Sequence, residues 1–134
     1  MSDEPPIRFG IRVDDVASAA ALYESLGFVP FATVPDEQGN PAIAILRRGP
    51  LQLVVDALRG LPFPDTVREQ QIKTGPRGLG MVVGIEVDDV DQTTRRSERA
   101  GCTITAPPAD APWGERYAEV LDPYGYAWKF FRTR

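Results

Sequence analysis

The chain has 134 residues, of which 43% are hydrophobic and 25% charged, as is typical of one globular domain. Its net charge of −4 and its scattered basic residues argue against nucleic acid as a partner. No apolar run approaches the roughly 18 to 20 residues of a membrane span, and the chain does not begin like a signal peptide, so we expect a cytoplasmic protein without a membrane partner.

The first predicted elements are a strand over residues 7–13 and a helix behind it. Apolar residues alternate with polar or small ones in the strand, which is the pattern of a half-buried strand. Asp14 or Asp15 can cap the helix, and Gly27 suits its C-terminal end. The apolar positions of the helix are Val16, Ala19, Ala20, Leu22, Tyr23 and Leu26. We therefore interpret the two aspartates as caps and not as catalytic groups.

Three more strands are predicted next, over residues 28–34, 42–47 and 51–56. They are separated by the turn-rich stretches PDEQGNP and RGP. Residues 57–78 have little periodicity and contain several prolines and glycines, which indicates a linker, with a helical turn around residues 65–71.

The stretch GIRVDDV at residues 10–16 then returns as GIEVDDV at residues 84–90, an offset of 74. Over residues 10–27 the identical pairs at this offset are Gly10/Gly84, Ile11/Ile85, Val13/Val87, Asp14/Asp88, Asp15/Asp89, Val16/Val90, Glu24/Glu98 and Gly27/Gly101. The strand and helix are therefore predicted a second time. Further strands follow over residues 102–106, 116–121 and 126–131.

The predicted organisation is a single domain over residues 1–134, of the α+β class, built from two βαβββ modules. The first module covers residues 7–56 and the second covers residues 79–132, and the linker of residues 57–78 joins them.

The two modules, the VDDV junction in each and the ending VLDPYGYAWKFF resemble the vicinal-oxygen-chelate superfamily of glyoxalases, bleomycin-resistance proteins and extradiol dioxygenases. The ending is similar to the family motif Asp-Pro-x-Gly-x-x-x-Glu-Phe at Asp122, Pro123, Gly125 and Phe130. The resemblance implies two curved four-stranded sheets that form a cup for a ligand, within a homodimer. Whether the cup closes within one chain or by exchange between chains is left open.

Metal-dependent relatives bind their ion through side chains of four strands, and the resemblance puts these positions at Arg8, Gln52, Val82 and Lys129. Of the four, only Gln52 could ligate a divalent cation. The resemblance is therefore to the non-metal branch, and we expect no metal and no cofactor. The single cysteine, Cys102, has apolar neighbours and is expected to be buried, and the absence of histidine excludes a Cys/His dyad.

Strand parity and loop position predict the residues that face the ligand. The seven candidates are Arg8, Arg12, Gln52, Glu86, Trp113, Tyr117 and Lys129. Arg12 and Glu86 could instead pair with each other, and Lys129 could point to solvent. Trp128 and Phe130 have the parity opposite to Lys129 and are expected in the core beneath the helices.

Two classes of function remain. In the first, the protein sequesters a small molecule, such as an antibiotic or an aromatic metabolite, in a metal-free cup without chemistry. Trp113 and Tyr117 would stack on its aromatic body, and the arginines would hold an acidic group. The alternative is a lyase, isomerase or dioxygenase of the superfamily with an atypical or displaced site, using Glu86, Glu115 or Tyr117 as acid or base.

Overall fold

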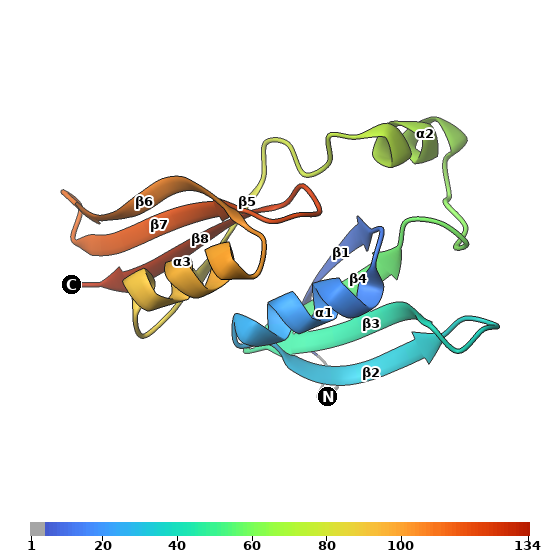
Figure 1. Ribbon diagram of the computed structural model, residues 1–134, viewed down its shortest axis with the longest axis horizontal. Coiled ribbons are helices and arrows are strands. Elements are labelled where there is room, and N and C mark those ends of the chain that lie inside the picture. Colours follow the sequence, from blue (N-terminus) through green and yellow to red (C-terminus); the bar gives the residue numbers. More distant parts are fainter. Residues whose placement is uncertain (1–4) are drawn as a thin grey trace. The chain divides into compact units, whose positions relative to one another are not determined.

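The computed structural model describes residues 5–134, and its secondary structure confirms the α+β class (Figure 1). The chain divides between Thr74 and Gly75 into two compact units. Each unit contains one four-stranded mixed sheet and a helix that packs against it. Over the described residues, no helix has the length and apolar character needed to cross a membrane.

The sheet of the first unit has the strand order β1-β4-β3-β2, in which β1 and β4 are parallel and the other neighbours antiparallel. Its elements are β1 (Ile7–Val13), α1 (Val16–Ser25), β2 (Val29–Pro35), β3 (Pro41–Arg48), β4 (Leu51–Ala57) and α2 (Thr66–Thr74). Helix α1 crosses one face of this sheet and packs mainly on β3 and β4 (Figure 1). The opposite face is therefore the one available to a ligand.

Helix α1 begins and ends as the sequence predicts. The Asp15 carboxylate accepts hydrogen bonds from the amide (3.1 Å) and the hydroxyl (2.9 Å) of Ser18, so it satisfies a donor that the helix itself cannot pair. Gly27, just past the helix, has a φ of 97°, a conformation that side chains disfavour. Apolar residues of the helix are buried against the sheet: Val16, Ala19, Leu22 and Tyr23.

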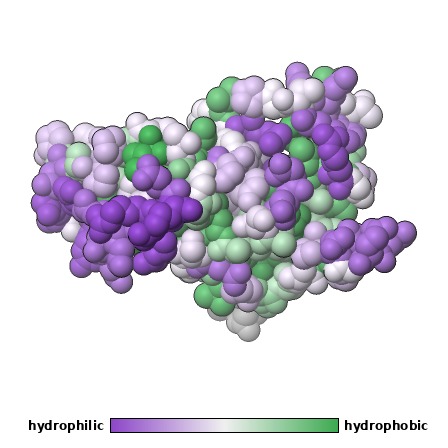
Figure 2. Space-filling model, viewed as in Figure 1, coloured by the Kyte–Doolittle hydropathy of each residue, from purple (hydrophilic) through white to green (hydrophobic). Residues whose placement is uncertain are grey.

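The second unit repeats this plan with the strand order β5-β8-β7-β6. Its elements are β5 (Val82–Glu86), α3 (Val90–Arg99), β6 (Thr103–Ala111), β7 (Glu115–Leu121) and β8 (Ala127–Thr133). Asp89 caps α3 by accepting from the Gln92 amide at 2.9 Å. The outer side of α3 carries Arg95, Arg96, Glu98 and Arg99, and strongly hydrophilic residues cover this helix in Figure 2.

The core under α3 contains the two aromatic residues predicted for it. Trp128 is 2% exposed and Phe130 is 0% exposed. The closing motif supplies an anchor beside them, because Asp122 accepts from the Trp128 indole at 2.9 Å and from the amides of Tyr124 and Tyr126. The motif thus fixes the turn between β7 and β8.

Two elements are longer than the sequence indicated. Strand β6 continues through Pro107 and Pro108 to Ala111, where we had predicted a loop after residue 106. It lies at the edge of its sheet, where a strand tolerates proline because half of its amides need no partner, and its register shifts at this point. The turn predicted in the linker is a full helix, α2, with Asp65 accepting from the Val67 amide at 2.8 Å.

Candidate functional site

The face of the second sheet opposite α3 carries three of the residues considered as candidates for function, Glu115, Tyr117 and Lys129. Ala118 and Phe130 are fully buried in the core on the α3 side of β7 and β8. Since side chains alternate along a strand, Glu115, Tyr117 and Lys129 lie on the other face. Neighbouring β7 and β8 therefore bring an acid, an aromatic ring and a base to one surface.

These residues form a cluster with Trp113, in the turn before β7, which we call the Trp113 cluster: Trp113, Glu115, Tyr117 and Lys129. The Trp113 and Tyr117 rings have centroids 5.8 Å apart and are tilted by 32°. The ammonium of Lys129 lies 5.8 Å from the Trp113 ring and 5.2 Å from the Tyr117 ring, within the range of cation–π attraction. Three of the seven predicted ligand residues thus come together.

Glu115 determines the charge of this cluster. It accepts a hydrogen bond from the ammonium of Lys129, and this bond, followed by one from Trp113, holds the pKa of the Glu115 carboxyl below its usual range. The acid and the base therefore offset each other near neutral pH. Trp113 remains 65% exposed, so the cluster offers an aromatic surface beside a balanced ion pair.

On the first sheet, Arg12 is engaged by the segment that follows β4. Its guanidinium donates to the carbonyl oxygens of Ala57 (3.0 Å) and Pro62 (2.7 Å). Its guanidinium carbon also lies 3.7 Å from the centroid of the Phe63 ring. The ammonium nitrogen of Lys73 lies 5.6 Å from the same centroid. These contacts tie the chain after β4 to strand β1. They give Arg12 an anchoring role that the sequence did not suggest.

Gln52, another predicted ligand residue of this sheet, is 7% exposed and accepts a hydrogen bond from Nε of Arg47 at 2.9 Å. The Arg47 guanidinium also stacks on Phe31, with its carbon 3.5 Å from the ring centroid. Sequence reasoning missed both Arg47 and Phe31. The alternation of Ile43 and Ile45 with alanine and leucine in β3 was visible, but the register that sets Arg47 beside Gln52 was not.

The remaining two candidates are exposed. Arg8 lies on β1 in register with Gln52 of β4. Glu86 ends β5, in register with Phe131 of β8. Arg12 and Glu86 belong to different units, and the alternative that they pair with each other stays a prediction.

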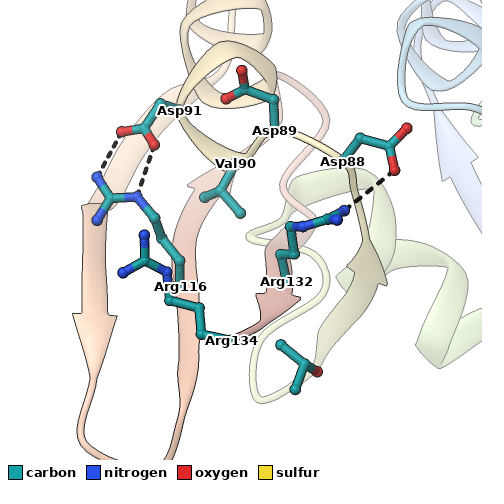
Figure 3. A pocket seen from close by; sticks show the side chains of 8 residues that line it. Asp88, Asp89, Val90, Asp91, Arg116, Arg132 and Arg134 are labelled. Carbon is teal, nitrogen blue, oxygen red and sulfur yellow. Dashed lines mark hydrogen bonds and ion pairs between the residues drawn. The ribbon is translucent and has the colours of Figure 1, made fainter.

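Each unit has a cavity of its own among the described residues. One of about 210 Å³, at the beginning of α3, is lined by three arginines. Figure 3 shows Arg116 paired with Asp91 and Arg132 paired with Asp88, and Arg134 pairs with Asp110. Arg116 holds Asp91 through two nitrogens, at 2.7 and 2.8 Å, so this cavity is chiefly an ion-pair network. The other, of about 390 Å³, lies between the β2–β3 hairpin and residues 57–61, among them Arg59.

The fold agrees with a comparison against known families. The model of the Glyoxalase/Bleomycin resistance protein/Dioxygenase superfamily matches residues 7–130. The chain belongs to this superfamily. The match spans both βαβββ units, as the resemblance of the sequence implied.

Individual proteins resemble the chain over almost its whole length. An uncharacterised protein of Mycobacterium bovis is 29% identical over 127 residues, which are 93% of this chain and 81% of the relative. The crystal structure of TioX from Micromonospora sp. ML1 is 27% identical, with a TM-score of 0.67 and coverage of 96% of this chain and 98% of that one. A superfamily enzyme from Burkholderia phytofirmans PsJN, 18% identical, shares the fold, with a TM-score of 0.73 and coverage of 95% and 97%.

The four positions that the family resemblance assigns to a metal, Arg8, Gln52, Val82 and Lys129, carry side chains that do not fit one. Arg8 is cationic, and the ammonium of Lys129 donates to Glu115. The amide oxygen of Gln52 accepts from Arg47, and Val82 has no donor atom. Over residues 5–134, no group of three or more His, Cys, Asp or Glu side chains could hold a metal ion. This donor set therefore disagrees with a divalent cation at the usual place.

Proposed function

We propose that this protein binds a small molecule with an aromatic or conjugated body and sequesters it without chemistry. The observation that carries the proposal is the Trp113 cluster on the face of the second sheet. Trp113 is a large ring left 65% exposed, and Tyr117 supports it from 5.8 Å. Two adjacent rings of this kind suit an aromatic ligand, which gains from both apolar contact and stacking.

The ion pair in the cluster adds a polar recognition group. An ammonium has three N–H donors, and the structure gives one of those of Lys129 to Glu115. The others can donate to a carbonyl, phenolate or carboxylate oxygen of the ligand. Antibiotics and aromatic metabolites with such groups are the candidate ligands.

The same pair favours binding over acid–base catalysis. A general base works best when its pKa lies near the working pH. Lys129 instead lowers the pKa of Glu115, which makes this carboxylate a weak base at neutral pH. The enzymatic alternative, a lyase, isomerase or dioxygenase with a displaced site, has no comparable feature among the residues of the cluster.

Tryptophan fluorescence tests the proposal directly, because the two tryptophans differ in exposure. Trp113 is 65% exposed and Trp128 is 2% exposed, so a ligand on the cluster should quench only the first. Aromatic metabolites and antibiotics would be screened by thermal shift, since a ligand of the native state raises its stability. We expect Trp113→Ala to weaken the best ligand about tenfold, which corresponds to about 1.4 kcal/mol.

The control is Leu79→Ala, which removes another exposed apolar side chain, 77% exposed, from the same unit. This variant should bind as the wild type does, and mass spectrometry should recover the ligand unchanged. Equal binding by Trp113→Ala and the wild type would place the ligand elsewhere, and conversion of the ligand would make the protein an enzyme.

We further propose a cytoplasmic homodimer, on the strength of composition and of the edge strands at both sides of each sheet. Light scattering should give about twice the chain mass of 14.7 kDa at micromolar concentration. A monomer at that concentration would contradict the dimer, and recovery of the protein in the membrane fraction of its native cell would contradict the location.

A further inference from the structure

The face of the first sheet opposite α1 holds a guanidinium whose position is fixed from two sides. We call Phe31, Arg47 and Gln52 the Arg47 site. Gln52 accepts from Nε of Arg47 at 2.9 Å, and the Phe31 ring covers one face of the guanidinium at 3.5 Å. Because Gln52 is 7% exposed, its amide is a rigid support. An arginine held in this way loses little freedom when it binds a ligand.

The two contacts leave the outer edge of Arg47 unused. They engage Nε and one face of the group, whereas the two terminal nitrogens carry four further N–H donors. Within residues 5–134, the structure gives Arg47 an amide and an aromatic ring as partners but no carboxylate at ion-pair distance. This differs from Arg116, which holds two aspartates, and from Arg132 and Arg134, each of which holds one.

The strands have a local irregularity at this site. The pairing of β2 with β3 shifts between Pro30 and Ala32, so Phe31 is the extra residue of a bulge. A bulge turns a side chain away from its regular direction, and here the ring of Phe31 lies over Arg47 although it remains 57% exposed. Stacking the ring on an arginine explains why a large apolar residue stays at the surface.

The register adds a second cation and an apolar border. One row across the sheet reads Arg8, Gln52, Arg47 and Val29, from β1 to β2. The row itself contains two arginines and no acidic residue. Val29 is 64% exposed and closes the row with apolar surface.

We propose that Arg47 is an anion-binding residue that takes the carboxylate of a ligand with an apolar body. The two terminal nitrogens of a guanidinium match the two oxygens of a carboxylate, and the stacked Phe31 and the nearby Val29 fit the apolar remainder. Gln52 is the positioning residue, because it touches Arg47 and not the ligand. This site lies in the first unit and does not depend on binding at the Trp113 cluster.

Titration with 2-naphthoate, followed by amide resonances in NMR spectra, tests this proposal, with 2-naphthamide as the uncharged counterpart. Naphthoate should shift the resonances of β3 and β4 around Arg47 and Gln52, and naphthamide should bind at least tenfold more weakly. Arg47→Ala should weaken naphthoate at least tenfold. Arg68→Ala, which removes an exposed charge of α2 in the same unit, should leave its binding unchanged.

Gln52→Glu separates the charge of the site from its shape. The new carboxylate would have nearly the same size as the amide but would neutralise Arg47, so naphthoate binding should fall at neutral pH. Unchanged binding in Arg47→Ala, or an equal loss in Arg68→Ala, would overturn the proposal. Shifts confined to the surroundings of Trp113 would also overturn it while supporting the proposed function. Shifts confined to the first sheet would support it and would leave the proposed function to the fluorescence test.

Discussion

Replacement of Asp122 by alanine should destabilise the second unit more than most single substitutions in this protein. Asp122 is 3% exposed, and one carboxylate oxygen accepts from the amides of Tyr124 (2.9 Å) and Tyr126 (3.0 Å). The other accepts from the Trp128 indole at 2.9 Å. A buried donor that loses its acceptor costs about 2 kcal/mol. Two of the three donors belong to buried residues, Tyr124 and Trp128, which gives about 4 kcal/mol in total.

The assay is urea unfolding, which yields the free energy of unfolding of each variant. Asp122→Asn should lose about half as much, because an amide has one carbonyl oxygen and can serve the backbone amides or the indole but not both. The control is Asp88→Ala, since Asp88 is exposed and its pair with Arg132 is long at 3.4 Å, and it should change stability by less than about 0.5 kcal/mol. A loss below about 1 kcal/mol in Asp122→Ala would refute the reasoning.

Three further predictions concern ionisable groups. Burial, together with the nearby charge of Asp122, raises the pKa of the Cys102 thiol to about 11. The native protein should therefore react with a thiol reagent at pH 8 far more slowly than protein unfolded in urea. Equal reaction rates would contradict this prediction. Burial raises the pKa of the Asp56 carboxyl despite the nearby Arg12, so the carboxyl destabilises the fold as it ionises with rising pH. Asp56→Asn should therefore raise the melting temperature at pH 7 but not below about pH 3.8, the usual pKa of the group. A lower melting temperature of this variant at pH 7 would contradict the prediction. Hydrogen bonds from Arg116 lower the pKa of the Asp91 carboxyl, so Asp91 stabilises the fold above its unfolded-state pKa and this stabilisation is lost in acid. Asp91→Asn should therefore lower the free energy of unfolding at pH 7 but not at pH 2. An equal loss of stability at both pH values would argue against the ion pair.

Most of the fold could be read from the sequence because its determinants are local. The caps Asp15 and Asp89 and the buried Trp128 follow from helix-end chemistry and from strand parity. The continuation of β6 through Pro107 could not be predicted in this way, because proline normally argues against a strand. A proline lacks the backbone N–H that a central strand donates to its neighbour, whereas an edge strand can do without it. Whether a strand lies at the edge of its sheet is not a local property of the sequence.

The sites were predictable only in part, for the same physical reason. Trp113, Tyr117 and Lys129 were identified from strand parity and loop position, and the structure brings them together. Arg47 needed the register of β3 against β4, and Phe31 needed the bulge in β2. Register and bulges arise from packing between strands, so no periodicity in one strand reveals them.

The internal repeat separates the residues that build the fold from those on the candidate ligand faces. At the offset of 74, Asp15 corresponds to Asp89, and both cap a helix in the same way. Arg8 corresponds to Val82, and each lies on the sheet face opposite the helix of its unit. On these faces the two units share neither charge nor polarity at this position. Every helix must satisfy its first amides, whereas the exposed face of a sheet has no such requirement. Two units that fold by the same rules can therefore offer different surfaces, one built around Arg47 and the other around Trp113.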